Sequence, residues 1–218
     1  MAEYDTIIFD MDGTTLDTLQ DLADSMNFTL NTFGYPARTL EEVRSFVGNG
    51  AARFMELSLP GGSDNPQFEN CLAAFKKRYA ENLQNKTAPF AGIPELLEKL
   101  HKENYKLAIV SNKFDQAVKA LNQKYFGKYI TVAIGETEAI KKKPAPDSVF
   151  QALEELHTCA EKAIYVGDSE VDVKTARNSG LISVGVTWGF GSRKILEEEG
   201  ADFIIDRPDE LLNILELV

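Results

Sequence analysis

The sequence predicts an α/β protein with a parallel sheet, interrupted near its start by a helical insert. From about residue 84 onwards, short apolar runs alternate with helical patterns, and such alternation predicts βαβ units with parallel strands. The runs are apolar at consecutive positions, which is typical of strands that are covered on both faces. Residues 16–83, in contrast, show helical spacing and no convincing strand.

The first predicted element is a buried strand at residues 4–9, which must end at Asp10 and Asp12 because Gly13 and Thr14 are poor strand formers. This strand needs partners, and the helical stretch 16–83 cannot supply them. The sequence therefore predicts one discontinuous α/β core domain, made of residues 1–15 and 84–218, with residues 16–83 inserted as a separate helical domain.

Turn and cap residues divide the insert into helices. Thr39, with Glu42 three residues later, forms the pattern of a capping box, and the segment 60–66 is rich in Pro and Gly, which is typical of a loop. We expect insert helices at 17–33, 40–47, 51–59 and 67–83.

The second part of the chain supplies the remaining strands and their crossover helices. Pro94 suits the first turn of a helix, and Gly180 ends another. We expect strands at 106–110, 130–134, 163–166, 182–186 and 203–205, and helices at 94–103, 115–125, 147–156, 171–178, 193–199 and 209–217. In such sheets ligands bind beyond the carboxyl ends of the strands.

Composition excludes some partners. The chain has 218 residues and a net charge of −11, from 34 acidic and 23 basic side chains. This negative field repels nucleic acid and anionic membranes. Cys71 and Cys159 stand far apart in helical-looking segments and are expected to be free thiols of a reducing compartment. Without a signal peptide pattern or a spanning apolar stretch, the sequence predicts a cytoplasmic protein.

Polar residues gather where the predicted strands end. They are Asp10 and Asp12 after the first strand, Ser111 and Asn112 after 106–110, Asp168, Ser169 and Asp172 after 163–166, and Lys143 before the helix at 147–156. Each residue type also has a plain structural use, as a helix cap, a turn or a solvated charge. Their coincidence at one edge of the sheet favours a catalytic site.

The residue types suggest phosphoryl transfer. Asp10, Asp12 and Asp168 offer hard oxygen ligands without a suitable His or Cys nearby, which favours Mg²⁺ over Zn²⁺. One carboxylate can act as a nucleophile, and a second one two residues away can move the proton. Lys143, the Ser111 hydroxyl and Mg²⁺ can stabilise the charge of the transferred group.

Four sequence blocks resemble the haloacid dehalogenase superfamily of Mg²⁺-dependent phosphohydrolases. In chain order they are Phe9–Thr14, Val110–Lys113, Lys143–Asp147, and Val166–Ser169 with Asp172. The resemblance implies a Rossmann-like core, and it implies that the insert is an α-helical cap that closes over the site and contributes to substrate choice.

The resemblance also implies a role for each matching residue. Asp10 would be the nucleophile, and Asp12 would be the general acid and base, with its backbone carbonyl on Mg²⁺. Asp10 and Asp168 would be the other Mg²⁺ ligands, supported by Asp172 and Ser169. Ser111, Asn112 and Lys143 would hold the phosphoryl group. Thr15 departs from the family pattern, which usually has an aliphatic residue at this position.

Softer signals bring the chain nearest to the phosphoglycolate phosphatases. They are Val47–Gly50, Ser111–Lys113, Gly185–Gly189 and Ala201–Ile205. We therefore expect a phosphatase that hydrolyses a small phosphorylated metabolite, with 2-phosphoglycolate as the best single candidate, through an aspartyl-phosphate.

Other functions stay open at this point. The enzyme class could also be a β-phosphoglucomutase-type phosphosugar mutase, or a phosphatase of a sugar phosphate, a nucleotide or pyrophosphate. Asp12 argues against a 2-haloacid dehalogenase, which does not need the second carboxylate, and against a non-enzymatic switch. Arg44, Asn49 and Arg53 are candidates for reading the substrate from the cap. Both a monomer and a homodimer are compatible with the sequence.

Overall fold

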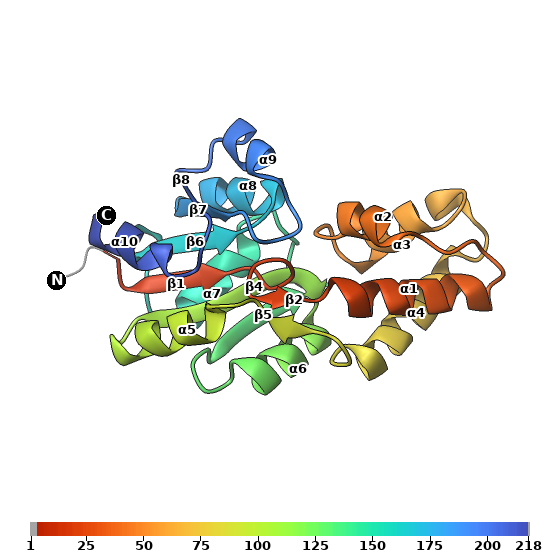
Figure 1. The fold of residues 1–218 in the computed structure, drawn as a ribbon, viewed down its shortest axis with the longest axis horizontal. Coiled ribbons are helices and arrows are strands. Elements are labelled where there is room, and N and C mark those ends of the chain that lie inside the picture. Colours follow the sequence, from red (N-terminus) through yellow and green to blue (C-terminus); the bar gives the residue numbers. More distant parts are fainter. Residues whose placement is uncertain (1–3, 218) are drawn as a thin grey trace.

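The computed structural model describes residues 4–217 and has a six-stranded sheet in which all neighbouring strands are parallel. The strand order is β5-β4-β1-β6-β7-β8 (Figure 1). Their bounds are Thr6–Phe9 for β1, Lys106–Phe114 for β4, Val132–Glu136 for β5, Ala163–Gly167 for β6, Ile182–Val186 for β7 and Phe203–Ile205 for β8. The predicted fold class is confirmed.

Successive side chains of β1 point to opposite faces of the sheet, and both faces are covered by helices. Ile7 and Phe9 belong to one apolar cluster, and Ile8 belongs to a second cluster on the other side. The first cluster includes α5 (Ile93–Lys102), α6 (Asp115–Tyr125) and α10 (Glu210–Leu217), and the second includes α7 (Asp147–Glu155) and α8 (Glu170–Ser179). The short α9 (Arg193–Glu198) follows β7.

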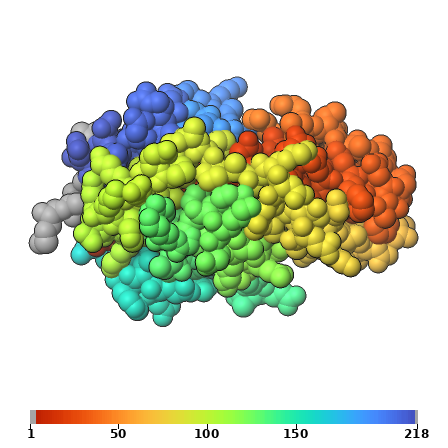
Figure 2. Space-filling view, turned by 60° about the horizontal axis from the view of Figure 1, so that its bottom comes forward, coloured from red at the N-terminus to blue at the C-terminus, as the bar shows by residue number. Residues whose placement is uncertain are grey.

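The insert forms four helices at one end of the molecule. They are α1 (Leu19–Thr32), α2 (Leu40–Phe46), α3 (Ala51–Ser58) and α4 (Phe68–Asn82), with a short 3₁₀ turn at Gly62–Asp64. In Figure 1 they lie beyond the carboxyl end of β1. In the space-filling view of Figure 2 they form one end of the surface, in red to yellow, beside the core.

Two chain crossings join the insert to the core, and they lie side by side. The two-residue strand β2 (Leu16–Asp17) pairs antiparallel with β3 (Ala88–Pro89). Next to this pair, the buried carboxylate of Asp21 accepts hydrogen bonds from the backbone amides of Lys86 and Thr87 at 2.9–3.0 Å. The division of the core and cap at residues 15/16 and 83/84 stays a prediction.

Several element boundaries differ from expectation. β2 lies in a stretch for which no strand was predicted, β4 continues through Phe114 instead of ending at 110, and β5 begins at Val132 instead of 130. Cys159 is not in a helix but precedes a 3₁₀ turn at Ala160–Lys162. Both cysteines are free thiols, as expected. No helix within residues 4–217 combines the length and apolar character needed to cross a bilayer.

The capping box of α2 gives a testable stability effect. The Thr39 hydroxyl accepts a hydrogen bond from the Glu42 amide at 3.2 Å, and the Glu42 carboxylate accepts one from the Thr39 amide at 2.7 Å. Thr39→Ala is expected to lower the free energy of unfolding by about 1 kcal/mol, because an amide at the helix start loses its partner. Urea denaturation measures this change. The control Ser45→Ala, an exposed position of the same helix, should change it by less than about 0.5 kcal/mol.

Candidate active site

Asp10 stands directly after β1, in the centre of the sheet, and is buried. Its amide donates to the Val166 carbonyl at 2.9 Å, which continues the parallel pairing and fixes the backbone. Its Oδ1 accepts a hydrogen bond from the ammonium of Lys143 at 2.8 Å. Burial raises the pKa of the Asp10 carboxyl to about 7, although the charge of Lys143 opposes the rise.

The buried ammonium of Lys143 connects the carboxylates of Asp10 and Asp172. Its Nζ lies 2.8 Å from Asp10, 2.7 Å from Asp172 and 2.9 Å from the Tyr165 hydroxyl. Burial alone would lower the pKa of the Lys143 ammonium, but the two carboxylates outweigh it and hold the pKa well above its usual value. Lys143 is therefore a fixed cation whose three donors point at named partners.

Asp168 follows β6, the strand beside β1, and its carboxylate is held at both oxygens. Oδ1 accepts from the Thr14 hydroxyl at 3.2 Å, and Oδ2 accepts from the amides of Phe190 and Gly191 at 2.7 and 3.1 Å. Burial, and next the neighbouring charges of Asp172 and Asp10, raise the pKa of Asp168 to about 8.

Asp172 lies behind these residues on α8. Its Oδ1 accepts from Lys143, and its Oδ2 accepts from the amide and hydroxyl of Ser169 at 3.1 and 2.6 Å. Because both of its oxygens have strong donors, Asp172 is placed to hold Lys143 and the start of α8 in position.

The carboxylates of Asp10, Asp168 and Asp172 could together hold a cation. One oxygen from each lies within 4.8 Å of the others, and all three side chains are buried. Three buried carboxylates repel one another unless protons or a cation compensate them, and the single ammonium of Lys143 cannot balance all three. An all-oxygen donor set of this kind fits Mg²⁺.

The Asp12 side chain points away from this cluster, towards the cap. Its two oxygens accept from the ammonium of Lys113 at 2.7 and 2.8 Å, and Oδ1 also accepts from the Thr18 hydroxyl at 2.7 Å. The Lys113 ammonium lies 4.6 Å from the ring centroid of Tyr79 on α4. The Asp12–Lys113 pair therefore stands at the junction of core and cap.

Ser111 and Asn112 lie within β4 rather than after it. Ser111 is buried, and together with Asp10 and Asp12 it lines a cavity that is described below. The Asn112 amide group donates to the carbonyls of Gly48 and Lys143, both at 3.0 Å, and accepts from the Lys143 amide at 2.8 Å. Its side chain thus joins the cap loop to the Lys143 loop, and its contact with a phosphoryl group stays a prediction.

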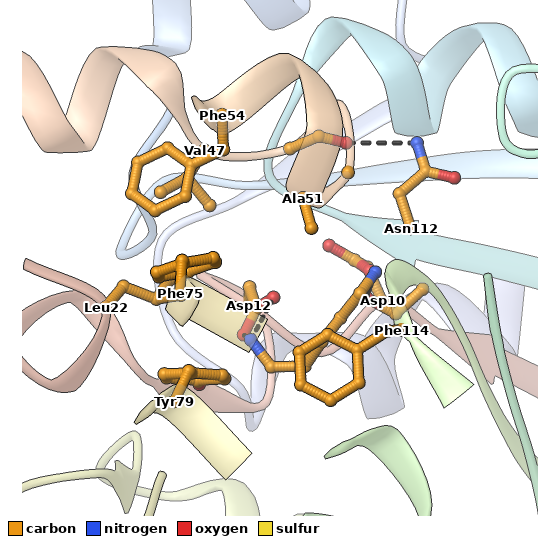
Figure 3. A pocket seen from close by; sticks show the side chains of 14 residues that line it. Asp10, Asp12, Leu22, Val47, Ala51, Phe54, Phe75, Tyr79, Asn112 and Phe114 are labelled. Atoms are coloured by element: carbon orange, nitrogen blue, oxygen red, sulfur yellow. Dashed lines mark hydrogen bonds and ion pairs between the residues drawn. The ribbon is translucent and has the colours of Figure 1, made fainter. Parts of the chain in front are cut away.

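A small cavity of about 40 Å³ opens between these residues and the cap (Figure 3). Figure 3 shows Asp10 and Asp12 at its core side, with apolar side chains of the cap facing them. The lining residues are Asp10, Asp12, Leu22, Val47, Gly48, Gly50, Ala51, Phe54, Phe75, Tyr79, Ser111, Asn112, Lys113 and Phe114.

None of the three cap residues suggested by the sequence is part of this lining. The Arg44 guanidinium lies over the ring of Phe190, at 5.9 Å from its centroid, and Arg53 pairs with Glu56 at 2.8 Å. Asn49 lies between the lining glycines, and its carbonyl accepts from Lys142. The cap meets the cavity with apolar side chains instead.

Sequence reasoning missed the partners that hold the carboxylates. Lys113 belongs to a recognised block, but the sequence predicts no role for it; it predicts Thr18 only as a candidate helix cap and Tyr165 only as a residue of the strand at 163–166. A usable signal did exist for Lys113, because a lysine that follows an apolar strand at the catalytic edge of a sheet needs an anion if it is buried. Thr15 is tied back into the loop, since its hydroxyl donates to the Asp10 carbonyl at 3.2 Å.

Comparison with known proteins identifies the family. A model of the haloacid dehalogenase-like hydrolases matches residues 7–186. A phosphoglycolate phosphatase of Pseudomonas putida is 32% identical over 94% of this chain and 78% of its own length. One of Aquifex aeolicus is 31% identical over 96% of both chains.

Solved structures agree over nearly the whole length. A crystal structure from Lactobacillus delbrueckii subsp. bulgaricus, provisionally described as a phosphoglycolate phosphatase, has a TM-score of 0.91 at 34% identity and covers 98% of both chains. A predicted phosphoglycolate phosphatase from Haemophilus somnus also has a TM-score of 0.91, at 26% identity, and covers 98% of this chain and 99% of its own. The chain therefore belongs to the haloacid dehalogenase-like hydrolase family.

Proposed function

We propose that the protein is a Mg²⁺-dependent phosphatase that hydrolyses a small phosphate monoester through an aspartyl-phosphate, with 2-phosphoglycolate as the substrate. The observation that carries the proposal is the pair of differently placed carboxylates, Asp10 among buried acids and a lysine, and Asp12 facing the cap. The relatives named phosphoglycolate phosphatase support the choice of substrate.

In the first proposed step, a carboxylate oxygen of Asp10 attacks phosphorus. Oδ1 of Asp10 accepts a hydrogen bond from Lys143. Oδ2 accepts none from residues 4–217, so it is the oxygen available for attack on phosphorus. The bond between phosphorus and the ester oxygen breaks, and Asp12 gives its proton to that oxygen. Lys143 would hold Asp10 in position, and the Ser111 hydroxyl, which lines the cavity, would bind a phosphoryl oxygen, with Lys143 adding its positive charge.

In the second proposed step, water attacks the phosphorus of the aspartyl-phosphate. Asp12, now ionised, takes the proton from the water, the bond to Asp10 breaks and inorganic phosphate leaves. Together the two steps convert a phosphate ester and water into an alcohol and inorganic phosphate. Asp10, the Asp12 carbonyl and Asp168 would hold Mg²⁺, with Asp172 and Ser169 in support. When bound, Mg²⁺ would neutralise charge on the transferred group.

A panel of phosphate esters with Mg²⁺ tests this function. The panel contains 2-phosphoglycolate, sugar phosphates, nucleotides and pyrophosphate. We expect the highest kcat/KM for 2-phosphoglycolate. A higher value for a sugar phosphate, nucleotide or pyrophosphate would contradict the proposed substrate, and inactivity on every ester would contradict phosphatase activity itself.

Mg²⁺ binding should depend on pH. Below their raised pKa values of about 7 and about 8, Asp10 and Asp168 hold protons in the metal-free protein, and a cation must displace these protons. Mg²⁺ affinity is therefore expected to rise with pH between about 6 and 9 and then to level off. Titration calorimetry in buffers of different ionisation enthalpy should show proton release at pH 7 that shrinks at pH 9. A pH-independent affinity would contradict the buried cluster as the cation site.

We also propose a cytoplasmic location. The free thiols Cys71 and Cys159 suit a reducing compartment.

A further inference from the structure

The cavity distributes its charge unevenly, and this bears on which ester it accepts. Its cap wall is made of apolar groups such as Leu22, Phe54 and Phe75. Among the described lining residues, Lys113 is the only lysine or arginine. Lys143 contacts Asp10 but does not line the cavity. A second anion on the substrate, away from the phosphoryl group, therefore meets one cationic side chain in this cavity.

Lys113 is also built into the site rather than lying on the surface. Its side chain is 4% exposed, and its ammonium stands between the Asp12 carboxylate and the ring of Tyr79. The Tyr79 ring in turn contacts Phe114, which follows Lys113 in β4, at a centroid distance of 6.1 Å. The aromatic contacts keep the lysine chain in place and leave its ammonium at the boundary between Asp12 and the cap.

The start of α3 is the other feature of the cavity that could meet an anion, through the amides near Gly50. An acidic side chain lies close to this end of the helix: a Cβ atom built on Gly50 would lie 2.7 Å from Oε2 of Glu136. A substrate carboxylate placed there would face the Glu136 carboxylate, whereas at Lys113 it faces an ammonium.

From this arrangement we propose that Lys113 determines specificity, by binding the carboxylate of a short phosphorylated acid such as 2-phosphoglycolate. The inference rests on the proposed phosphatase function and names the substrate class that the same site selects. A substrate carboxylate competes with Asp12 for the ammonium, so the lysine transfers from Asp12 to the substrate. Asp12 keeps its hydrogen bond from Thr18 and is freed to turn towards the ester oxygen.

This exchange links recognition to proton transfer. An ester with a neutral tail leaves Lys113 on Asp12, where it holds the acid and base away from the reaction. An ester with a carboxylate tail supplies the replacement anion and releases Asp12. The walls also limit size, because about 40 Å³ corresponds to only a few water molecules at roughly 10–15 Å³ each.

The test compares two esters on the same enzyme preparation. One is 2-phosphoglycolate, and the other is 2-hydroxyethyl phosphate, in which a hydroxymethyl group replaces the carboxylate. The wild-type enzyme is expected to prefer the acid by about 10- to 100-fold in kcat/KM, the range for a hydrogen bond between charged groups. In Lys113→Met this ratio should approach one, and Lys113→Arg should keep part of the preference. The ratio is independent of the fraction of enzyme that is folded.

The matched control is Lys142→Met, which removes an exposed lysine whose ammonium donates to the Asn49 carbonyl outside the cavity. It should keep the wild-type ratio, which excludes a general effect of lost positive charge. A Lys113→Met enzyme with an unchanged ratio would overturn the inference while the phosphatase function stands. A wild-type enzyme that prefers the neutral ester would also overturn it, and inactivity on both esters would overturn the proposed function as well.

Inhibition of the wild-type enzyme gives a second test that needs no variant. 3-Phosphonopropionate carries the carboxylate on an uncleavable chain, and propylphosphonate lacks it. The inhibition constant of the acid is expected to be lower by about 10-fold or more. Equal constants for the two phosphonates would contradict recognition of the carboxylate by Lys113.

Discussion

Asp10→Asn is expected to abolish hydrolysis, with a fall in kcat of at least about 10⁴-fold, as for other nucleophiles that act in a catalytic unit. Asparagine has the shape of aspartate but lacks the charged oxygen that must attack phosphorus. The substitution also removes a charge from the buried acidic cluster, so it should weaken Mg²⁺ binding. Steady-state phosphate release measures the loss, and mass spectrometry after an acid quench should detect a phosphorylated Asp10 in the wild type alone.

The control for this experiment is Asp17→Asn. Asp17 is exposed, lies in β2 seven positions after Asp10, and among the described residues its side chain accepts one hydrogen bond, from the Leu19 amide at 3.3 Å. It should retain turnover close to that of the wild type. If Asp10→Asn still turned over substrate at a substantial rate, the assignment of the nucleophile would be wrong.

Asp12→Asn is expected to lower kcat by about 10²- to 10⁴-fold, the contribution of a positioned acid and base. The loss should depend on the leaving group. An alkyl ester such as 2-phosphoglycolate needs a proton on its leaving oxygen, whereas p-nitrophenolate leaves without one. Formation of the aspartyl-phosphate, measured by rapid quench, should therefore be impaired much less with p-nitrophenyl phosphate. If the rate of aspartyl-phosphate formation fell equally with both esters, proton donation by Asp12 would be contradicted.

The same variant affects stability, and this effect must be separated from catalysis. Without Asp12, the buried ammonium of Lys113 has no carboxylate partner, and an uncompensated buried charge costs about 3–5 kcal/mol. The double variant Asp12→Asn/Lys113→Met removes the stranded charge and should recover part of the unfolding free energy. Its turnover of alkyl esters should stay low, because proton transfer is still missing.

Much of the core could be predicted because each strand carries its own signal. Ile7, Ile8 and Phe9 are all apolar, and the structure buries them on alternate faces. The polar residues after β1 and β6 were therefore expected at one edge, where Asp10 and Asp168 do meet. The capping box at Thr39 was equally local and is confirmed.

The rest depends on contacts that no local pattern contains. The pairing of Asp12 with Lys113 spans 101 residues, so no local pattern in the sequence connects the two side chains. β4 was expected to end at 110 because Ser111, Asn112 and Lys113 are polar, yet hydrogen-bonding and ionic partners allow these side chains to be buried in a strand. β2 and β3 have two residues each, which is too short for any periodicity.

The pairing of β2 with β3 brings the two ends of the helical insert together. Because Leu16 lies opposite Pro89, the chain leaves the core and returns to it at neighbouring points, and the 72 positions between them contain no strand of the six-stranded sheet. A domain inserted between adjacent ends can be exchanged for one of another size or lining without rebuilding its host. The same phosphoryl-transfer chemistry could thus be offered to new substrates by evolution, or by design, through substitution of one contiguous segment.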